Sequence, residues 1–265
     1  MLLAIDAGNT NIVFAACDGD TIVAQWRAST KISRTADEYG AWLADLLALQ
    51  GMKLSDLDSA IIACVVPNAL FDLRTMCTRY LRCEPLVIGT PEVDPGLKIN
   101  YERPGGVGAD RLADAVAGHE RYPGALIVVD FGTATTFNVV SEEGDYEGGV
   151  IAPGVNLSAE ALHQAAALLP RVAFHRTPTV IGKDTVPAMQ SGMYWGYVSL
   201  IEGLVARIKT EYGKPMTVIA TGGLASIFQR QVAVIDHVDP DLTIRGLMLI
   251  HARNQAKGKS RPAAS

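Results

Sequence analysis

The chain of 265 residues has few of the features that mark secreted, membrane or nucleic-acid-binding proteins. Its four cysteines form no CxxC pair, so we expect reduced, partly buried thiols, which favours the cytoplasm over an oxidising compartment. No apolar run reaches the length of a membrane span, and the N-terminus lacks the basic segment of a signal peptide. With a formal net charge of -5 and no basic block, a nucleic-acid or anionic-membrane partner is disfavoured.

Two common nucleotide-binding motifs are also missing. There is no GxxxxGK[ST] sequence, and no GxGxxG opens a helix after a strand. The five histidines show no metal-binding spacing such as HExxH, so we expect them on the surface or in the core. These absences exclude two ways of holding ATP and leave open a site built from hairpin loops.

The first half of the chain predicts strands followed by helices. Alternating apolar residues in "LLAIDAG", "NIVFAACDG" and "TIVAQWRAS" predict three strands joined by tight turns. Helical spacing in "TADEYGAWLADLLALQG" and "NALFDLRTMCTRYLRC" predicts two helices, with buried strands in "SAIIACVVP" and "EPLVIG". A long loop, "DPGLKINYERPGGVGAD", precedes the helix "ADRLADAVAGHERYPG". This order indicates an α/β lobe.

A similar pattern occurs twice, about half a chain length apart. In the first copy an apolar strand ends at Asp6, Gly8 follows, and small amide or hydroxyl side chains lead into the next strand. In the second copy Asp130 and Gly132 hold the same positions before "TATT". One such turn is weak evidence, because an acidic turn-former at a strand end is common. Two copies in matching context predict a duplicated fold of two similar lobes with a cleft between them.

Glycine-led turns of this kind are suited to phosphate groups. Without a Cβ the backbone can approach a ligand closely, and its N–H groups form a concave donor surface. An aspartate beside that surface repels phosphate unless a cation lies between them, as Mg²⁺ does in many nucleotide sites. The combination of Asp, Gly, Thr and Asn therefore indicates a metal–nucleotide site. The carboxylate of Asp130 is expected to hold a cation, because a lone buried carboxylate is costly unless paired or metal-bound.

Six segments, in this order, closely resemble the type III pantothenate kinases of the acetate kinase/hsp70/actin-like superfamily. They are "AIDAGNTN", "YERPGGVGADRLADAVAG", "VVDFGTATTFNVV", "GGVIAPG", "IGKDTVPAMQSGMYWG" and "ATGGLA". The resemblance covers nearly the whole chain, and "GADRL" and "DFGTATT" are its specific elements. It implies two actin-like (ribonuclease H-like) lobes and ATP-dependent phosphorylation of pantothenate, the first step of coenzyme A synthesis. It also implies a homodimer.

The resemblance further implies roles for individual residues. Asp110 matches the proton acceptor, Asp130 matches the ligand of a monovalent cation (K⁺ or NH₄⁺), and Asp6 lies near Mg²⁺–ATP. The first phosphate loop, and with it ATP binding, is assigned to Asp6, Ala7, Gly8, Asn9, Thr10 and Asn11, with Thr133 as a further ATP contact. Pantothenate contacts are assigned to Tyr101, Gly108, Ala109, Asp110, Arg111 and Thr185.

Asp110 opens a helix, and this position creates a conflict with a role as base. The positive end of the helix dipole is expected to favour the ionised carboxylate, which weakens it as a base. The conflict is resolved if Asp110 mainly accepts a hydrogen bond from the pantothenate hydroxyl and takes the proton late. The planar fork of Arg111 suits the pantothenate carboxylate. Taken alone, both residues would fit an exposed helix start equally well, and Thr185 after "IGKD" would fit a helix N-cap.

We expect an N-terminal lobe over residues 1–115, a C-terminal lobe over 116–252 and a flexible tail over 253–265. The family often has an Asn-Pro-acid run before "GADR", where this chain has Arg103-Pro104-Gly105-Gly106, which predicts a looser substrate loop. Gly222 and Gly223 in "ATGGLA" either approach the nucleotide or serve tight packing. Two other functions stay open: another small-molecule kinase of the superfamily, for a sugar or acetate, and a non-catalytic regulatory relative.

Overall fold

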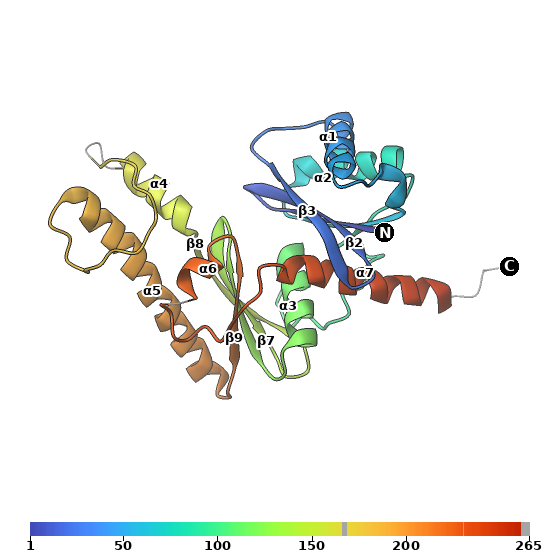
Figure 1. Cartoon of the computed structure of the whole chain (residues 1–265). Helices are drawn as coiled ribbons and strands as arrows, with labels where there is room; N and C mark the ends of the chain where they lie inside the picture. Colours follow the sequence, from blue (N-terminus) through green and yellow to red (C-terminus); the bar gives the residue numbers. More distant parts are fainter. Residues whose placement is uncertain (166–168, 230, 261–265) are drawn as a thin grey trace. The chain divides into compact units, whose positions relative to one another are not determined.

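The computed structural model of the chain describes residues 1–165, 169–229 and 231–260 (Figure 1). The chain divides into two compact units. The first comprises Met1–Glu120 and the segment from Leu242 onward, and the second comprises Arg121–Asp241. No helix in the described ranges combines the length and the apolar character that a membrane crossing needs.

This division differs from the one expected after residue 115. Helix α3 runs without a break over Ala109–Arg121, so the chain leaves the first unit only at the end of that helix. Helix α7 (Leu242–Ser260) then returns to the first unit and packs against its sheet. Residues 253–257, expected in a flexible tail, belong to this helix and form side-chain contacts. Residues 261–265 lie outside the described part of the chain.

The first unit is built on a five-stranded sheet in the order β3-β2-β1-β4-β5. Strands β1, β2 and β3 are antiparallel neighbours, as the alternating sequence predicted, whereas β4 and β5 run parallel to β1. Its elements are β1 (Leu2–Ala7), β2 (Asn11–Asp18), β3 (Thr21–Ser29), α1 (Ala36–Leu49), η1 (Leu54–Asp56), β4 (Ser59–Cys64), α2 (Pro67–Met76), the π-helical turn η2 (Cys77–Leu81), β5 (Leu86–Val87), η3 (Pro104–Gly106), α3 and α7.

The second unit repeats this topology. Its sheet has the order β10-β9-β6-β7-β8, so that β6, β7, β8, β9 and β10 take the places of β1 to β5. Its elements are β6 (Leu126–Phe131), β7 (Ala134–Val140), β8 (Tyr146–Pro153), α4 (Val155–Ala165), α5 (Thr185–Tyr212), β9 (Thr217–Gly222), α6 (Ala225–Phe228) and β10 (His237–Val238). The predicted α/β fold with two similar lobes is therefore confirmed.

Each sheet has two unlike faces, because successive side chains of a strand point to opposite sides. In β1, Leu3 and Ile5 are fully buried in a core shared with α1 and α2, whereas the alternate position Asp6 belongs to the other face. In β6, Ile127 and Val129 are buried in a core shared with α5 and α6, and Asp130 again holds the alternate position. The two aspartates thus occupy equivalent places in the two sheets.

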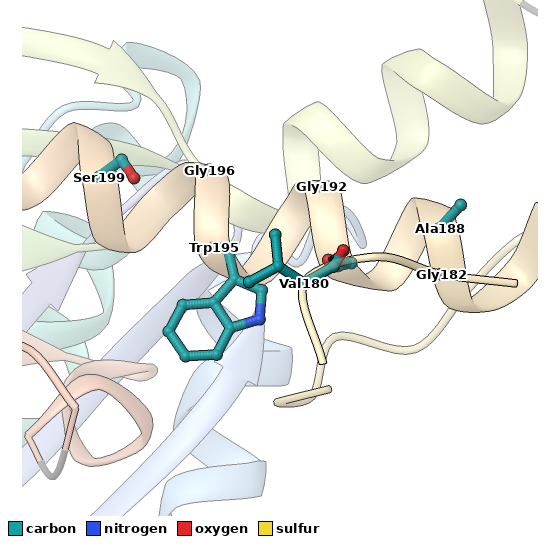
Figure 2. Close-up of a pocket in the computed structure, with 8 residues that line it drawn as sticks. Val180, Gly182, Ala188, Gly192, Trp195, Gly196 and Ser199 are labelled. Atoms are coloured by element: carbon teal, nitrogen blue, oxygen red, sulfur yellow. Dashed lines mark hydrogen bonds between the residues drawn. The ribbon is translucent and has the colours of Figure 1, made fainter. Parts of the chain in front are cut away.

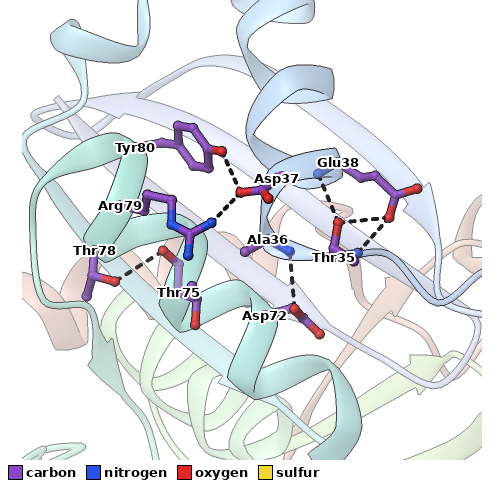
Figure 3. A network of polar contacts seen from close by, with 9 residues as sticks. All are labelled: Thr35, Ala36, Asp37, Glu38, Asp72, Thr75, Thr78, Arg79 and Tyr80. Atoms are coloured by element: carbon purple, nitrogen blue, oxygen red, sulfur yellow. Dashed lines mark hydrogen bonds and ion pairs between the residues drawn. The ribbon is translucent and has the colours of Figure 1, made fainter.

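The helical side of the first unit is held together by a network of polar contacts at the start of α1 (Figure 3). Thr35 and Glu38 form a capping box, in which the Thr35 amide donates to Glu38 and the Glu38 amide donates to the Thr35 hydroxyl. In the first turn, Asp37 accepts hydrogen bonds from Arg79 at 2.6 Å and from Tyr80 at 2.5 Å. These contacts fix α1 against η2 on the face of the sheet away from Asp6.

Candidate active site

The first predicted phosphate loop is the turn between β1 and β2. Ala7 pairs with Ile12 at the end of the ladder, which leaves residues 8–11 as the turn. The Gly8 amide donates to the Asn11 carbonyl at 3.0 Å and closes this turn. The side chains of the loop are exposed at Asn9, Thr10 and Asn11, and Asp6 is half-buried at the strand end.

Thr30, directly after β3, holds this loop in place. Its amide donates to the Thr10 carbonyl at 3.0 Å, and its hydroxyl donates to the Gly8 carbonyl at 2.7 Å. Both bonds end on carbonyl oxygens of the loop and use none of its N–H groups. Thr30 was not among the residues predicted from the sequence, since its partner Gly8 lies 22 positions earlier in the chain.

The second loop lies between β6 and β7 and is one residue shorter. Phe131 pairs with Thr135, so only residues 132–134 form the turn. The Gly132 amide donates to the Ala134 carbonyl at 3.0 Å, and the Gly154 amide, directly after β8, donates to the Thr133 carbonyl at 3.1 Å. Gly154 therefore holds the second loop from the position that Thr30 has in the first, and the exposed Thr133 side chain extends from that loop.

The carboxylate of Asp130 lies between two glycines. A Cβ on Gly222 would lie 2.4 Å from one carboxylate oxygen of Asp130, and a Cβ on Gly132 would lie 3.4 Å from the other. Gly222 also has a φ of 87°, which an L-residue adopts only with strain. Gly222 was expected either to approach the nucleotide or to serve tight packing. In the structure it packs closely against the Asp130 carboxylate.

Gly154 packs closely on the second loop. A Cβ on Gly154 would lie 2.2 Å from the Thr133 carbonyl oxygen and 2.7 Å from the Gly132 carbonyl oxygen. The described residues contain no group of three or more His, Cys, Asp or Glu side chains that could hold a metal ion.

The substrate segment predicted around Asp110 lies near the first phosphate loop. The Val65 amide, just past β4, donates to the Ala7 carbonyl at 3.0 Å. Gly108 lies next to Val65: a Cβ on Gly108 would be 3.6 Å from Val65 Cγ1. A Cβ on Gly108 would also lie only 2.5 Å from Asp110 Oδ1, so only glycine leaves room for this carboxylate. Val65, directly after β4, therefore contacts both the end of the strand that bears Asp6 and the turn that precedes Asp110.

The expectation that the helix start lowers the pKa of Asp110 is wrong. Burial raises the pKa of this carboxyl above its ordinary value, and the hydrogen bond from the Arg111 amide, at 2.8 Å, only partly opposes that effect. Removing the charged form from water outweighs the field of the helix terminus. Asp110 is thus a stronger proton acceptor than its place in the sequence suggested.

The other predicted pantothenate contacts in the first unit differ in exposure. Tyr101 is 41% exposed, whereas Ala109 is buried and Arg111 is only 9% exposed. The run that departs from the family pattern forms a closed turn, in which the Gly106 amide donates to the Arg103 carbonyl at 2.8 Å. The two glycines thus take part in a 3-10 turn, where the sequence analysis expected a loose loop.

Thr185 is the first residue of α5 in the second unit. The structure assigns the N-cap to Asp184, whose carboxylate accepts from the Thr185 amide at 2.7 Å, so Thr185 itself is not the cap. Its side chain is exposed. Further along this helix a pocket is lined by the segment around Val180 and by small residues of α5, with Trp195 at its wall (Figure 2).

Comparisons with known proteins agree on one family. The sequence model of the family described as type III pantothenate kinase matches residues 2–207. The chain is 62% identical to the type III pantothenate kinase of Paramagnetospirillum magneticum, over 96% of this chain and 98% of that relative. It is also 62% identical to the enzyme of the same description from Rhodospirillum rubrum, over 96% and 99%.

A solved structure supports the fold independently. The inorganic polyphosphate/ATP-glucomannokinase of Arthrobacter sp. strain KM aligns over 97% of this chain and 98% of its own, with a TM-score of 0.51. The two sequences are 13% identical, so this likeness concerns the fold alone.

We predict that Gly222→Ala destabilises the protein and displaces the Asp130 carboxylate. The positive φ and the overlap with Asp130 together should cost about 2 kcal/mol or more in the free energy of unfolding, measured by chemical denaturation. The neighbouring Gly223→Ala is the matched control, because nothing lies within 4 Å of its Cβ, and it should stay within about 0.5 kcal/mol of the parent protein. Equal stability of the two variants would contradict the packing described for Gly222.

Proposed function

The chain belongs to the type III pantothenate kinase family, and from this premise we propose which of its residues carry the reaction. The activity is ATP-dependent phosphorylation of pantothenate to 4'-phosphopantothenate in coenzyme A biosynthesis. The observation that carries the assignment is the position of Asp110: a half-buried carboxylate with a raised pKa, fixed near the strand end that bears Asp6 and the first phosphate loop.

Asp110 is the proton acceptor in this proposal. Phosphoryl transfer has a loose transition state, so the enzyme contributes mainly by positioning groups and neutralising charge. Asp110 accepts the hydrogen bond of the pantothenate hydroxyl, orients its oxygen, and takes the proton late. Tyr101, Gly108, Ala109 and Arg111 contact the rest of pantothenate, with Thr185 as a further contact. The Arg111 guanidinium binds the carboxylate, because its planar fork matches two oxygens.

Residues 6–11 bind the phosphates of ATP, and Thr133 is a further ATP contact. When bound, Mg²⁺ neutralises phosphate charge, and Asp6 is the carboxylate placed to attract it. Asp130 binds a monovalent cation, K⁺ or NH₄⁺. The support is the pair of glycine turns held from behind by Thr30 and Gly154, which leave their exposed side to a ligand.

The proposal includes a cytoplasmic homodimer that acts on a small molecule and binds neither nucleic acid nor membrane. The four cysteines are all free thiols, which fits a reducing compartment.

Two apolar side chains beside the pocket on α5 support a partner surface, since Val180 is 63% exposed and Ile181 is 71% exposed.

We predict that the protein releases ADP with pantothenate and not with acetate or glucose. A coupled ADP-release assay with the three substrates side by side measures this directly. Turnover with glucose or acetate alone would favour another kinase of the superfamily, and no turnover with any of them would favour a regulatory relative.

We predict that Asp110→Asn lowers turnover by about 10²–10⁴-fold and leaves ATP binding unchanged, because an amide cannot accept the proton. Steady-state kinetics and ATP titration by calorimetry measure the two effects. Asp45→Asn, an exposed carboxylate on α1, is the control and should behave as the parent protein.

The same carboxyl should set the acid side of the pH profile. Asp110 must be ionised to accept a proton, so kcat/KM falls as the pH drops through its pKa. Since burial raises that pKa, the fall should occur at a higher pH than for an ordinary aspartate.

Near-normal turnover of Asp110→Asn would remove this residue from the mechanism.

We predict that activity depends on K⁺ or NH₄⁺. Replacing K⁺ by Na⁺ at constant ionic strength should lower the rate, and Asp130→Asn should remove the difference between the two salts. Equal rates of the parent enzyme in both salts would contradict a cation site at Asp130.

A further inference from the structure

The loop that carries Tyr101 depends on contacts from outside itself. It connects β5 to α3 over residues 88–108, and its only helical turn is the three-residue η3. Besides η3, the segment forms only a single bridge, at Ile99, so its position depends largely on tertiary contacts. The first part of the loop, at Asp94 and Gly96, lies against α7.

Asn254 of α7 binds the loop backbone in both directions. The Asp94 amide donates to Asn254 Oδ1 at 3.1 Å, and Asn254 Nδ2 donates to the Asp94 carbonyl at 2.8 Å. One side-chain amide thus satisfies both main-chain groups of Asp94, much as a neighbouring strand would. The two residues are 160 positions apart in the chain.

The neighbours of Asn254 on the same helix face strengthen this contact. Lys257 forms an ion pair with the Asp94 carboxylate, whose other oxygen accepts from the Gly96 amide at 2.7 Å. Gly96, with a φ of 78°, lies against Arg253: a Cβ there would be 3.0 Å from the guanidinium. Residues 253, 254 and 257 are spaced by three and four, so they share one face of the helix.

The same helix face reaches the end of α3. Arg253 Nη2 lies 3.1 Å from Glu120 Oε2, in the last turn of the helix that carries Asp110 in its first turn. Thr243, nearer the start of α7, donates to Asp114 at 2.7 Å, and Gly246 packs against the Ala113 carbonyl with no room for a Cβ. Helix α7 therefore contacts both the loop with Tyr101 and the helix with Asp110.

We propose that Asn254 and Lys257 are positioning residues for pantothenate binding, because they hold the Tyr101 loop in its binding arrangement from the C-terminal helix. This inference rests on the function proposed above. Neither residue is proposed to touch pantothenate. If the loop is released, only a fraction of molecules has the binding arrangement, and the apparent affinity falls by that fraction.

The test is the kinetics of Asn254→Ala and Lys257→Ala in the full-length protein. Asn254→Ala removes both hydrogen bonds to the Asp94 backbone and should raise the KM for pantothenate about tenfold or more. The KM for ATP and kcat should stay within twofold, because saturating pantothenate restores the loop. Lys257→Ala should give a smaller rise, since the pair is exposed.

Gln255→Ala is the matched control, since this residue is exposed on the same helix and its side-chain amide lies 3.4 Å from His251 Nε2. A KM for pantothenate unchanged in Asn254→Ala, or a parallel rise in both KM values, would overturn the proposal. Hydrogen exchange gives a readout independent of activity: Asn254→Ala should speed exchange in residues 94–106 and not in residues 8–11. If the parent protein shows no pantothenate kinase activity, the proposed function fails. Faster exchange in residues 94–106 would still establish the contact as the element that orders the loop, and unchanged exchange there would overturn it.

Discussion

The candidate site depends on carboxylates packed against glycines. Asp110 lies over Gly108, and Asp130 lies against Gly222, at separations that leave no room for a Cβ. This packing restricts where each carboxylate can lie. It also explains why a side chain at Gly108 or Gly222 would displace a neighbouring carboxylate.

Burial of a carboxylate has a chemical consequence that differs between the two sites. At Asp110, loss of hydration raises the pKa and outweighs both the helix terminus and the hydrogen bond from Arg111. Burying this charge costs folding free energy, and the same loss of hydration makes the Asp110 carboxylate a stronger base. At Asp130, the carboxylate packs between Gly222 and Gly132, and the cation that we propose there would offset its charge. The proposed roles thus differ, with a proton at Asp110 and a cation at Asp130.

The sequence predicts the parts of the site that depend on local patterns. Alternation of apolar residues located β1 to β3, and the repeated Asp and Gly positions predicted the duplicated sheets, which the strand orders confirm. The contacts of Thr30 with Gly8 and of Asn254 with Asp94 join residues 22 and 160 positions apart, and no local pattern encodes such pairs. The pKa of Asp110 was predicted in the wrong direction because its burial results from tertiary packing, which a helix-start pattern does not reveal. The residue roles themselves came from the family resemblance and stay predictions.

The two halves of the duplication differ where their ligands should differ. The first loop has four turn residues, and the Thr30 hydroxyl adds a second bond to its backbone. The second has three, and Gly154 at the equivalent place supplies a backbone bond alone while packing closely on the loop carbonyls. A longer turn with exposed amide and hydroxyl side chains suits the several oxygens of a polyphosphate. The shorter turn leaves one carboxylate, Asp130, packed between two glycines, and we propose a single cation there. The proposed roles of the two hairpins therefore differ, as the lengths of their turns do.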